Sequence, residues 1–326
     1  MSLLQVRHVR VSYASERGDV AAVDDVSLTI EPGEVLGLAG ESACGKTTLA
    51  LAVPRLLPET ASVTGGVTFE GRDLLSLTET EMRTVRWKGI SVVFQGAMNA
   101  LNPCHTVGHQ IMEPIRLHEP GTTARAARAR VGELLEQVGI PASRAAAYPH
   151  EFSGGMRQRV MIAMALACRP RLVIADEPAT ALDVMTQAQI LNLLRQLQRD
   201  LGLAMILISH DLSVLAEICD RVAIMYAGAV VESGPGEVIF GSTDAGLGPV
   251  HPYTRSLLRA FPNIRRERTF VEGIPGYPPD LAVPLSGCRF YERCSVHIDV
   301  CRTISPELLP TRPGHLAACH LVPPQP

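Results

Sequence analysis

Residues 40–48 read GESACGKTT, and this stretch decides the fold class. It fits the pattern G-x-x-x-x-G-K-[ST] of a phosphate-binding loop, or P-loop. The run before it (33–39, GEVLGLA) predicts a strand, and the run after it (46–57, KTTLALAVPRLL) predicts a helix. In that context backbone N–H groups and the helix N-terminus form an anion cradle. We expect Lys46 to reach the β- and γ-phosphates of a nucleotide and the Thr47 hydroxyl to bind Mg²⁺.

A second nucleotide element is predicted at residues 172–178, which read LVIADEP. The aliphatic residues indicate a buried parallel strand, and ligands of α/β sheets bind at the carboxyl ends of such strands. Asp176 is the expected partner of Mg²⁺, and Glu177 is expected to orient or deprotonate an attacking water. An isolated acidic pair would more often cap a helix. Because this pair follows a P-loop, the nucleotide role is preferred.

Composition places the chain among globular proteins and gives no electrostatic reason to bind nucleic acid. Its 326 residues are 46% apolar and 19% charged, with a formal net charge of −3. The N-terminus lacks the charged and apolar regions of a signal peptide, and the longest apolar runs are too short to span a bilayer. We therefore expect a cytosolic protein whose thiols stay reduced.

The pattern along the chain predicts a large α/β domain, residues 1–248, and a small C-terminal extension, residues 249–326. Roughly the first 35 residues alternate apolar and polar positions, as in antiparallel strands. The middle is mainly helical, and residues 123–139 (TARAARARVGELLEQVG) show helical spacing that ends at a glycine. From about Pro249 prolines and cysteines become frequent and periodicity weakens.

The stretch FSGGMRQRV, residues 152–160, distinguishes this chain from other P-loop proteins. It precedes a strongly helical run and offers another helix N-terminus with free N–H groups. Lying between the two nucleotide motifs, it resembles the signature sequence of ATP-binding-cassette (ABC) proteins. The resemblance covers about residues 3–235 and implies an α/β fold: a P-loop NTPase cassette with a RecA-like core. An antiparallel β subdomain and a helical subdomain at about 96–165 complete that fold.

The chain looks still more similar to ATPases of the dipeptide/oligopeptide permease group. The motifs behind this are ALNP (100–103), YPHEFSGGMRQRVMIAMALACRP (148–170), ADEPATALDV (175–184), MYAG (225–228), HPYTRSLL (251–258) and the cysteines of the tail. The implied function is ATP hydrolysis that drives the import of peptides across the cytoplasmic membrane. Proteins of this group contain no channel of their own, which agrees with the short apolar runs.

The resemblance also implies a role for individual residues. The expected ATP contacts are Tyr13, which stacks on adenine, and Gly40, Glu41, Ser42, Ala43, Cys44, Gly45, Lys46, Thr47, Thr48, Gln95 and Asp176. Mg²⁺ would be held by Thr47, Gln95 and Asp176. The expected catalytic residues are Glu177, His210, Lys46 and Gln95, with His210 as the switch histidine. Ser153, Gly154, Gly155 and Met156 would contact the ATP held by a partner cassette, and Asp183 belongs to the D-loop.

The implied partners follow from the same resemblance. One signature in one chain requires a second ABC ATPase subunit, which is usually a paralogue in this group and gives a heterodimer. Two transmembrane permease subunits and an extracytoplasmic solute-binding protein complete the system, and nucleic acid has no part in it. The chain would lie peripherally at the cytoplasmic face of the membrane. Residues 96–115 or so would receive a coupling helix of the channel.

Four alternatives to ATP-driven peptide import remain open. The stretch QGAMNALNP (95–103) departs from the peptide group and is similar to importers of oligosaccharides; nickel is the other candidate solute. A soluble ABC ATPase that acts on ribosomes or DNA is disfavoured by the single cassette, the absence of sustained heptads and the mild acidity. A cassette that binds ATP without hydrolysing it is disfavoured because the sequence retains Lys46, Asp176, Glu177 and His210.

Ala43 is a departure within the P-loop, where many members of the family have glycine. If the loop needs a left-handed residue there, alanine costs about 1 kcal/mol. The general P-loop pattern leaves this position free, so we expect nucleotide binding to survive.

Four of the eight cysteines lie in the tail, spaced C-x5-C-x6-C-x17-C, as Cys288, Cys294, Cys301 and Cys319. Four thiolates in a reducing compartment suit a [4Fe–4S] cluster, and the resemblance supports one. Zinc is an alternative, although its sites usually have tighter spacing, with His297, His315 or His320 as substitute ligands. Free thiols and disulfides are the other two possibilities. Cys44, Cys104, Cys168 and Cys219 are expected to be small, mostly buried apolar residues.

Overall fold

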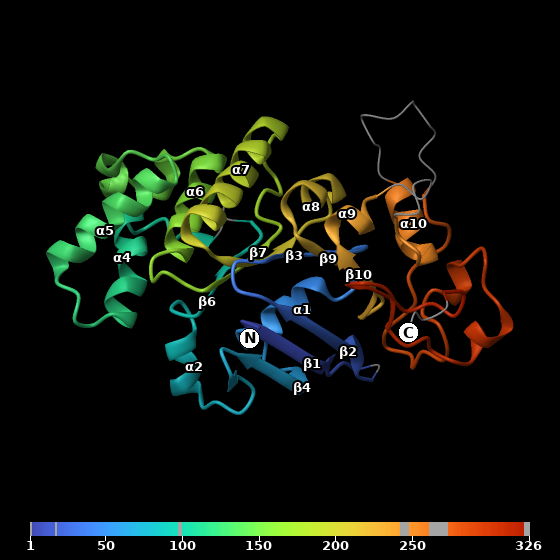
Figure 1. Ribbon diagram of the computed structural model, residues 1–326. Coiled ribbons are helices and arrows are strands. Elements are labelled where there is room, and N and C mark those ends of the chain that lie inside the picture. The colour runs from blue at the N-terminus through green and yellow to red at the C-terminus, as the bar shows by residue number, and fades with distance from the viewer. Residues whose placement is uncertain (1, 17, 97–99, 242–247, 261–272, 323–326) are drawn as a thin grey trace. The chain divides into compact units, whose positions relative to one another are not determined.

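The computed structural model describes residues 2–16, 18–96, 100–241, 248–260 and 273–322 (Figure 1). The chain forms two compact units whose sequences interleave. Unit 1 holds residues 31–34 and 73–208, and unit 2 holds residues 2–30, 35–72 and the described part of 209–326. The P-loop and the C-terminal extension therefore belong to the same compact unit.

Unit 2 opens with an antiparallel sheet, as the alternation of the first residues predicts. Strand β1 (Leu4–Tyr13) lies between β2 (Val20–Ile30) and β4 (Ala61–Phe69), and pairs antiparallel with both. The apolar side chains of β1 are buried, which gives this sheet its core face. The short strand β5 (Arg72–Asp73) follows β4 where the chain leaves this unit.

The second sheet of unit 2 carries the P-loop. Strand β3 (Val35–Ala39) is fully buried and pairs parallel with β9 (Arg221–Tyr226). Strand β10 (Ala229–Pro235) runs antiparallel to β9 and to β12 (His315–Ala317), which pairs with β11 (Leu309–Arg312). The extension thus adds two strands to the sheet that begins with the strand of the phosphate loop.

Short helices complete unit 2. Helix α1 (Lys46–Ala52) follows the P-loop and ends earlier than the predicted residue 57, because Pro54 has no N–H to continue the hydrogen-bond ladder. Helices α8 (Leu212–Ile218), α9 (Gly236–Ile239) and α10 (Pro252–Arg259) come later in the chain. The extension adds two 3₁₀ turns, η4 (Tyr291–Arg293) and η5 (Asp299–Arg302).

Unit 1 contains a parallel sheet and the predicted helical region. Strand β7 (Leu172–Asp176) lies between β6 (Ile90–Val93) and β8 (Ala204–Ile208), and all three are parallel. The helices are α2 (Glu79–Val85), α4 (Val107–His118), α5 (Ala124–Gln137), α6 (Gly154–Ala165) and α7 (Val184–Leu201), with 3₁₀ turns η1 (Ala142–Ala146) and η2 (Pro149–Glu151). Threonine, serine or aspartate caps each of the five helices. Helix α5, which Thr123 caps, confirms the helix predicted over residues 123–139.

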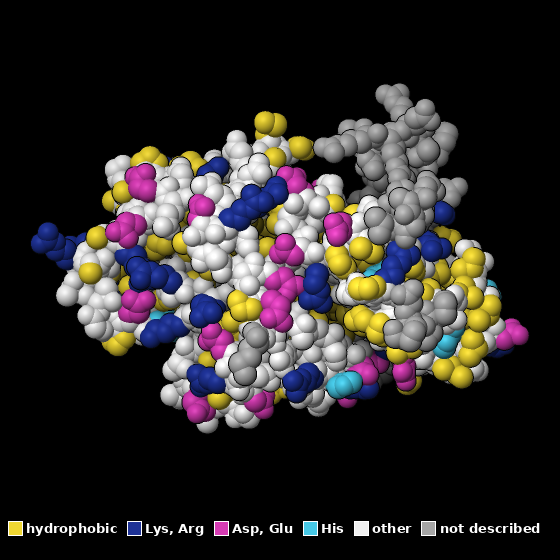
Figure 2. Space-filling view, in the orientation of Figure 1, with side chains coloured by type: hydrophobic (Ala, Val, Ile, Leu, Met, Phe, Trp, Pro, Cys, Tyr) yellow, Lys and Arg dark blue, Asp and Glu magenta, His cyan; other side chains and the backbone are white. Residues whose placement is uncertain are grey.

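The surface agrees with the mild net charge. On the face drawn in Figure 2, acidic and basic side chains are interspersed rather than separated into patches of one sign. Hydrophobic side chains gather over the C-terminal segment in that view; apolar residues of this segment that are exposed include Tyr277, Val283 and Val296. Among the described residues, no helix combines the length and the apolar character needed to cross a bilayer.

Candidate functional site

The phosphate loop of unit 2 closes around its own lysine. Gly45 has φ 102° and caps helix α1, which begins at Lys46. The Lys46 ammonium donates to the carbonyl oxygens of Gly40 and Glu41, both at 2.9 Å, and the residue is 7% exposed. The positive charge is thus held within the loop whose N–H groups are suited to bind an anion.

Three residues of this loop have positive φ angles: Gly40 at 146°, Ala43 at 61° and Gly45 at 102°. Ala43 has φ 61°, so this position is left-handed, which is the condition under which alanine was expected to be less favourable than glycine. Gly45 could not be replaced in the same way, because a Cβ atom there would come within 2.3 Å of the Ala22 carbonyl oxygen. The loop therefore carries strain at Ala43 that the surrounding contacts must hold.

Two more expected nucleotide contacts lie close to the loop. The Tyr13 hydroxyl, at the end of β1, lies 3.4 Å from the Thr48 hydroxyl on α1. The neighbouring residue Thr47 is exposed, so its side chain is accessible to a ligand. Cys44 is buried under the loop, and desolvation raises the pKa of its thiol, so it stays neutral.

Unit 1 holds the acidic motif and brings Gln95 to it. Asp176 ends strand β7 and is 4% exposed. Glu177 follows with φ 44°, and its Oε2 accepts hydrogen bonds from Gln95 Nε2 and Thr180 Oγ1, both at 2.8 Å. The carboxylate is therefore fixed in orientation by two neutral donors, one of which comes from a loop 82 residues earlier.

The signature stretch and the D-loop also meet within unit 1. Ser153 caps α6 by accepting from the Met156 N–H at 3.3 Å. A Cβ atom at Gly155 would lie 2.4 Å from Thr186 Cγ2, so any larger residue there would displace the Thr186 side chain. Thr186 is held in turn by Asp183, whose carboxylate accepts from its backbone N–H at 3.0 Å and its hydroxyl at 2.7 Å. These hydrogen bonds lower the pKa of Asp183.

The expected switch histidine, His210, follows strand β8 and is exposed. It lies in the part of unit 2 that starts at Ser209 and contains α8, whereas β8 itself belongs to unit 1. The residues expected to handle nucleotide are thus divided between the two units: Tyr13, the P-loop and His210 in one, and Gln95, the acidic motif, the signature and the D-loop in the other. Of the stretch QGAMNALNP, residues 97–99 lie outside the described residues.

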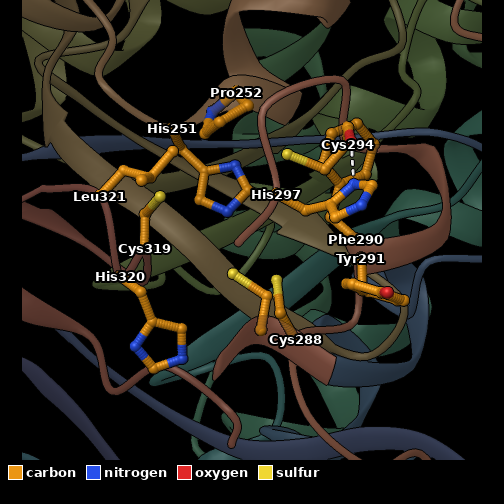
Figure 3. Close-up of a pocket in the computed structure, with 11 residues that line it drawn as sticks. His251, Pro252, Cys288, Phe290, Tyr291, Cys294, His297, Cys319, His320 and Leu321 are labelled. Atoms are coloured by element: carbon orange, nitrogen blue, oxygen red, sulfur yellow. Dashed lines mark hydrogen bonds between the residues drawn. The ribbon is translucent and has the colours of Figure 1, made fainter. Parts of the chain in front are cut away.

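The four tail cysteines line a single pocket in unit 2 (Figure 3). They come from separate positions: Cys288 before η4, Cys294 after it, Cys301 in η5 and Cys319 after β12. The Cys288 N–H donates to the Cys301 carbonyl oxygen at 2.7 Å, which ties two of these segments together. Phe290 and Tyr291 give the pocket an apolar lining.

Partial burial disfavours the thiolate form of three of these cysteines, Cys288, Cys294 and Cys319. Desolvation raises the pKa of Cys288 to about 11 and also raises the pKa values of Cys294 and Cys319. All eight cysteines of the chain are described, and each is a free thiol. Three of the four remaining cysteines are buried as expected, while Cys104 is exposed. Within the described residues, no three Cys, His, Asp or Glu side chains are grouped closely enough to hold a metal ion as they stand.

The histidines near the cysteines differ from the set named from sequence. His297 and His320 line the pocket, and so does His251, which the spacing of the tail gave no reason to include. Burial lowers the pKa of His251 to about 4, and its Nδ1 accepts from the Tyr253 N–H at 3.0 Å. His315 does not line the pocket: its ring nitrogens bond Glu232 at 2.8 Å and Thr311 at 3.0 Å. His315 is therefore not available as a zinc ligand.

Comparison with known proteins identifies relatives along the whole chain. The ABC transporter family matches residues 23–180, and the family "Oligopeptide/dipeptide transporter, C-terminal region" matches residues 231–301. The "Probable peptide ABC transporter ATP-binding protein y4tR" of Sinorhizobium fredii is 49% identical over 97% of this chain and 94% of its own. The oligopeptide transport ATP-binding protein OppD of Salmonella typhimurium is 46% identical over 97% and 93%.

A solved structure shows the same fold. The ATP-binding cassette MJ0796, in a dimeric post-hydrolysis state bound to ADP and Pi, superposes with a TM-score of 0.64. It is 28% identical and covers 71% of this chain and 98% of its own.

Proposed function

The chain belongs to the ABC transporter family, in its oligopeptide/dipeptide group, and from this premise we propose that it hydrolyses ATP to drive the uptake of peptides. The full-length similarity to peptide transporter ATP-binding proteins carries the proposal. The intact set of nucleotide motifs supports hydrolysis rather than binding alone, because Lys46, Glu177 and His210 are all retained.

In this proposal each motif has one task. The N–H groups of the P-loop and the Lys46 ammonium bind the phosphates, Tyr13 stacks on the adenine, and His210 contacts the γ-phosphate. Mg²⁺, held by Thr47, Gln95 and Asp176, would neutralise the charge that develops on the phosphates.

Glu177 positions or deprotonates the attacking water. A general base must be within hydrogen-bond reach of the water and must keep a fixed orientation. The hydrogen bonds from Gln95 and Thr180 supply that orientation, and Glu177 itself has a left-handed backbone with φ 44°. Such strained conformations cluster at sites where the orientation of a side chain matters.

The signature would act on a second nucleotide. Ser153, Gly154, Gly155 and Met156 at the start of α6 would bind the ATP held by a partner cassette, with Asp183 close to that contact. The dimeric state of the related cassette MJ0796 supports such an arrangement. We propose that the partner is a paralogous ATPase, and that two permease subunits and a solute-binding protein complete the transporter at the cytoplasmic face of the membrane. Residues near 96–115 would dock the permease.

We further propose that Cys288, Cys294, Cys301 and Cys319 hold a [4Fe–4S] cluster, with zinc as the alternative. The four thiols share one pocket, and they are the donor set that such a cluster takes. The raised pKa values of Cys288, Cys294 and Cys319 mean that the charge of a bound metal would be needed to keep these three side chains as thiolates. Protein purified without oxygen should be brown, absorb near roughly 400 nm and contain about four irons. Colourless protein with one equivalent of zinc would contradict the cluster.

Reconstitution of the whole transporter tests the function. With its permease subunits, partner ATPase and binding protein in proteoliposomes, ATP hydrolysis should rise when the binding protein is loaded with peptide. Glu177→Gln should abolish hydrolysis while ATP binding is retained, because the exchange keeps the size of the side chain and removes only its basicity. Full activity of Glu177→Gln would contradict the assignment, and stimulation by an oligosaccharide or nickel instead of peptide would contradict the solute.

A further inference from the structure

The first two tail cysteines enclose two arginines that anchor the segment to the nucleotide-binding part of unit 2. The sequence from Cys288 to Cys294 is CRFYERC, so Arg289 follows one cysteine and Arg293 precedes the other. Arg289 pairs with Asp24 on β2 and donates to the Ala227 carbonyl oxygen at 2.6 Å. Arg293 reaches the P-loop itself.

Arg293 forms a two-pronged ion pair with Glu41, the second residue of the P-loop stretch. Its Nη1 lies 2.7 Å from Glu41 Oε2, and its Nη2 lies 3.0 Å from Glu41 Oε1. The Arg293 side chain is 5% exposed, and that of Glu41 is 26% exposed. Paired, planar geometry of this kind gives the strongest and most directional ion pairs in proteins.

Contacts other than the ion pair with Glu41 also hold the Arg293 guanidinium in place. Arg293 also donates to the carbonyl oxygen of Pro275 at 2.8 Å and to that of Ile274 at 3.3 Å. Its Nη1 lies 3.3 Å from the Tyr226 hydroxyl. Because the extension fixes the arginine on several sides, the ion pair transmits the position of the extension to the P-loop.

Glu41 is held on its backbone as well as on its side chain. Its N–H donates to the Tyr253 hydroxyl at 2.9 Å. Tyr253 lies on α10, is fully buried, and packs against Tyr226 and Phe290 with ring centroids 4.6 and 5.4 Å away. The Glu41 carbonyl oxygen accepts from Lys46. One residue thus connects the extension to the lysine that is suited to bind phosphate.

From these contacts we propose that Arg293 and Tyr253 are positioning residues for nucleotide binding, which they control by fixing Glu41 at the start of the P-loop. We call these three residues the P-loop latch. The inference rests on the proposed ATP-binding function and extends it to the C-terminal extension. An anion cradle binds well only when its N–H groups are fixed in advance. This loop needs such support because Ala43, two residues after Glu41, is left-handed.

Equilibrium binding of a fluorescent ATP analogue with Mg²⁺ to the full-length chain tests the latch. Arg293→Ala should weaken binding about tenfold, within the usual range for coupling between two sites. Arg302→Ala is the matched control: this arginine also adjoins a tail cysteine, but it is exposed. It should bind as the wild type does. Wild-type affinity in Arg293→Ala would overturn the proposal.

Two further variants separate positioning from loss of fold. Tyr253→Phe removes only the acceptor of the Glu41 N–H and keeps the ring packing. It should also weaken binding, while its loss of stability stays within the roughly 1–3 kcal/mol that one unpaired donor costs, so that the chain remains folded. Arg293→Lys keeps the positive charge but loses the planar guanidinium that contacts both Glu41 oxygens, so its affinity should lie between those of Arg293→Ala and the wild type. If the loss of binding in Arg293→Ala and Tyr253→Phe is fully explained by the fraction of protein that is unfolded, the proposal is contradicted.

A double-mutant cycle shows whether Arg293 acts through Glu41. In a Glu41→Ala background, Arg293→Ala should change the affinity for the analogue by less than about twofold, because the contact is already absent. Independent, multiplying losses would overturn the proposal. A wild-type chain that does not bind the analogue at all would instead contradict the ATP-binding function, so the two failures are distinguishable.

Discussion

Glu232 is predicted to anchor the C-terminal extension to the cassette. It lies on β10 with no exposed surface, and its Oε1 accepts from the Val250 N–H at 2.6 Å and from His315 Nε2 at 2.8 Å. Its Oε2 accepts from the His251 N–H at 3.2 Å. Three donors, from the start of the extension and from β12, thus depend on one buried carboxylate.

The number of donors left without an acceptor sets the expected loss of stability. In Glu232→Gln one carboxylate oxygen becomes an NH₂ group, which faces at least one donor, so the variant should lose about 2 kcal/mol. Glu232→Ala leaves all three donors and a cavity, and should lose about 4–5 kcal/mol. With an unfolding entropy of about 2.1 cal/mol/K for each of the 326 residues, these losses correspond to falls in Tm of roughly 3 °C and 7 °C.

Thermal denaturation followed by circular dichroism measures both losses, and limited proteolysis reports release of the extension. Glu237→Ala is the matched control, because Glu237 lies a few residues later on α9 and is exposed. The order of stability should be wild type and control, then Glu232→Gln, then Glu232→Ala. The reasoning is refuted if Glu232→Ala melts with the control, or if both Glu232 variants lose the same stability.

Three other predictions follow from single residues. Ala43→Gly removes about 1–2 kcal/mol of left-handed strain and adds up to about 1 kcal/mol of chain entropy on unfolding, so chemical denaturation should show a gain of about 0.5–1 kcal/mol; a loss of stability would contradict it. Gly155→Ala puts a Cβ atom 2.4 Å from Thr186, so the assembled transporter should lose about tenfold or more of its ATPase activity while the isolated chain binds nucleotide normally; equal loss of both would contradict it. Because burial holds the pKa of His251 at about 4 against about 6.5 in the unfolded chain, the unfolded state binds the extra proton. Stability present above pH 6.5 is therefore lost as the pH falls towards 4, by about 3 kcal/mol. His251→Asn should show a flatter pH dependence of stability in denaturant titrations, and an unchanged slope would contradict this.

The nucleotide motifs could be read from sequence because each is local. A P-loop needs a strand, a glycine-containing turn and a helix start within about 20 residues, and β3, Gly45 and α1 follow in that order. The same holds for strand β7 with its terminal acidic residue and for the serine that caps α6. Spacing along the chain and hydrophobic periodicity were sufficient for these elements.

The tail shows where sequence reasoning stopped. The density of cysteines indicated a shared site, and the structure does place all four around one pocket. The spacing did not show that His251 joins them, or that His315 is engaged by Glu232 instead. Such choices depend on which strands pair, and no periodic pattern marks the pairing of β10 with β12.

The sequence by itself determined the family, and it predicted which residues bind and hydrolyse ATP, since these residues lie in short stretches with fixed spacing. Only the tertiary structure decided that Arg293 meets Glu41, 252 residues away, and that Tyr253 holds the same residue from α10. A contact between distant residues is chosen by the packing of whole strands and helices, which leaves no local signal in the chain. For that reason the connection between the cysteine segment and the P-loop emerges from the fold alone.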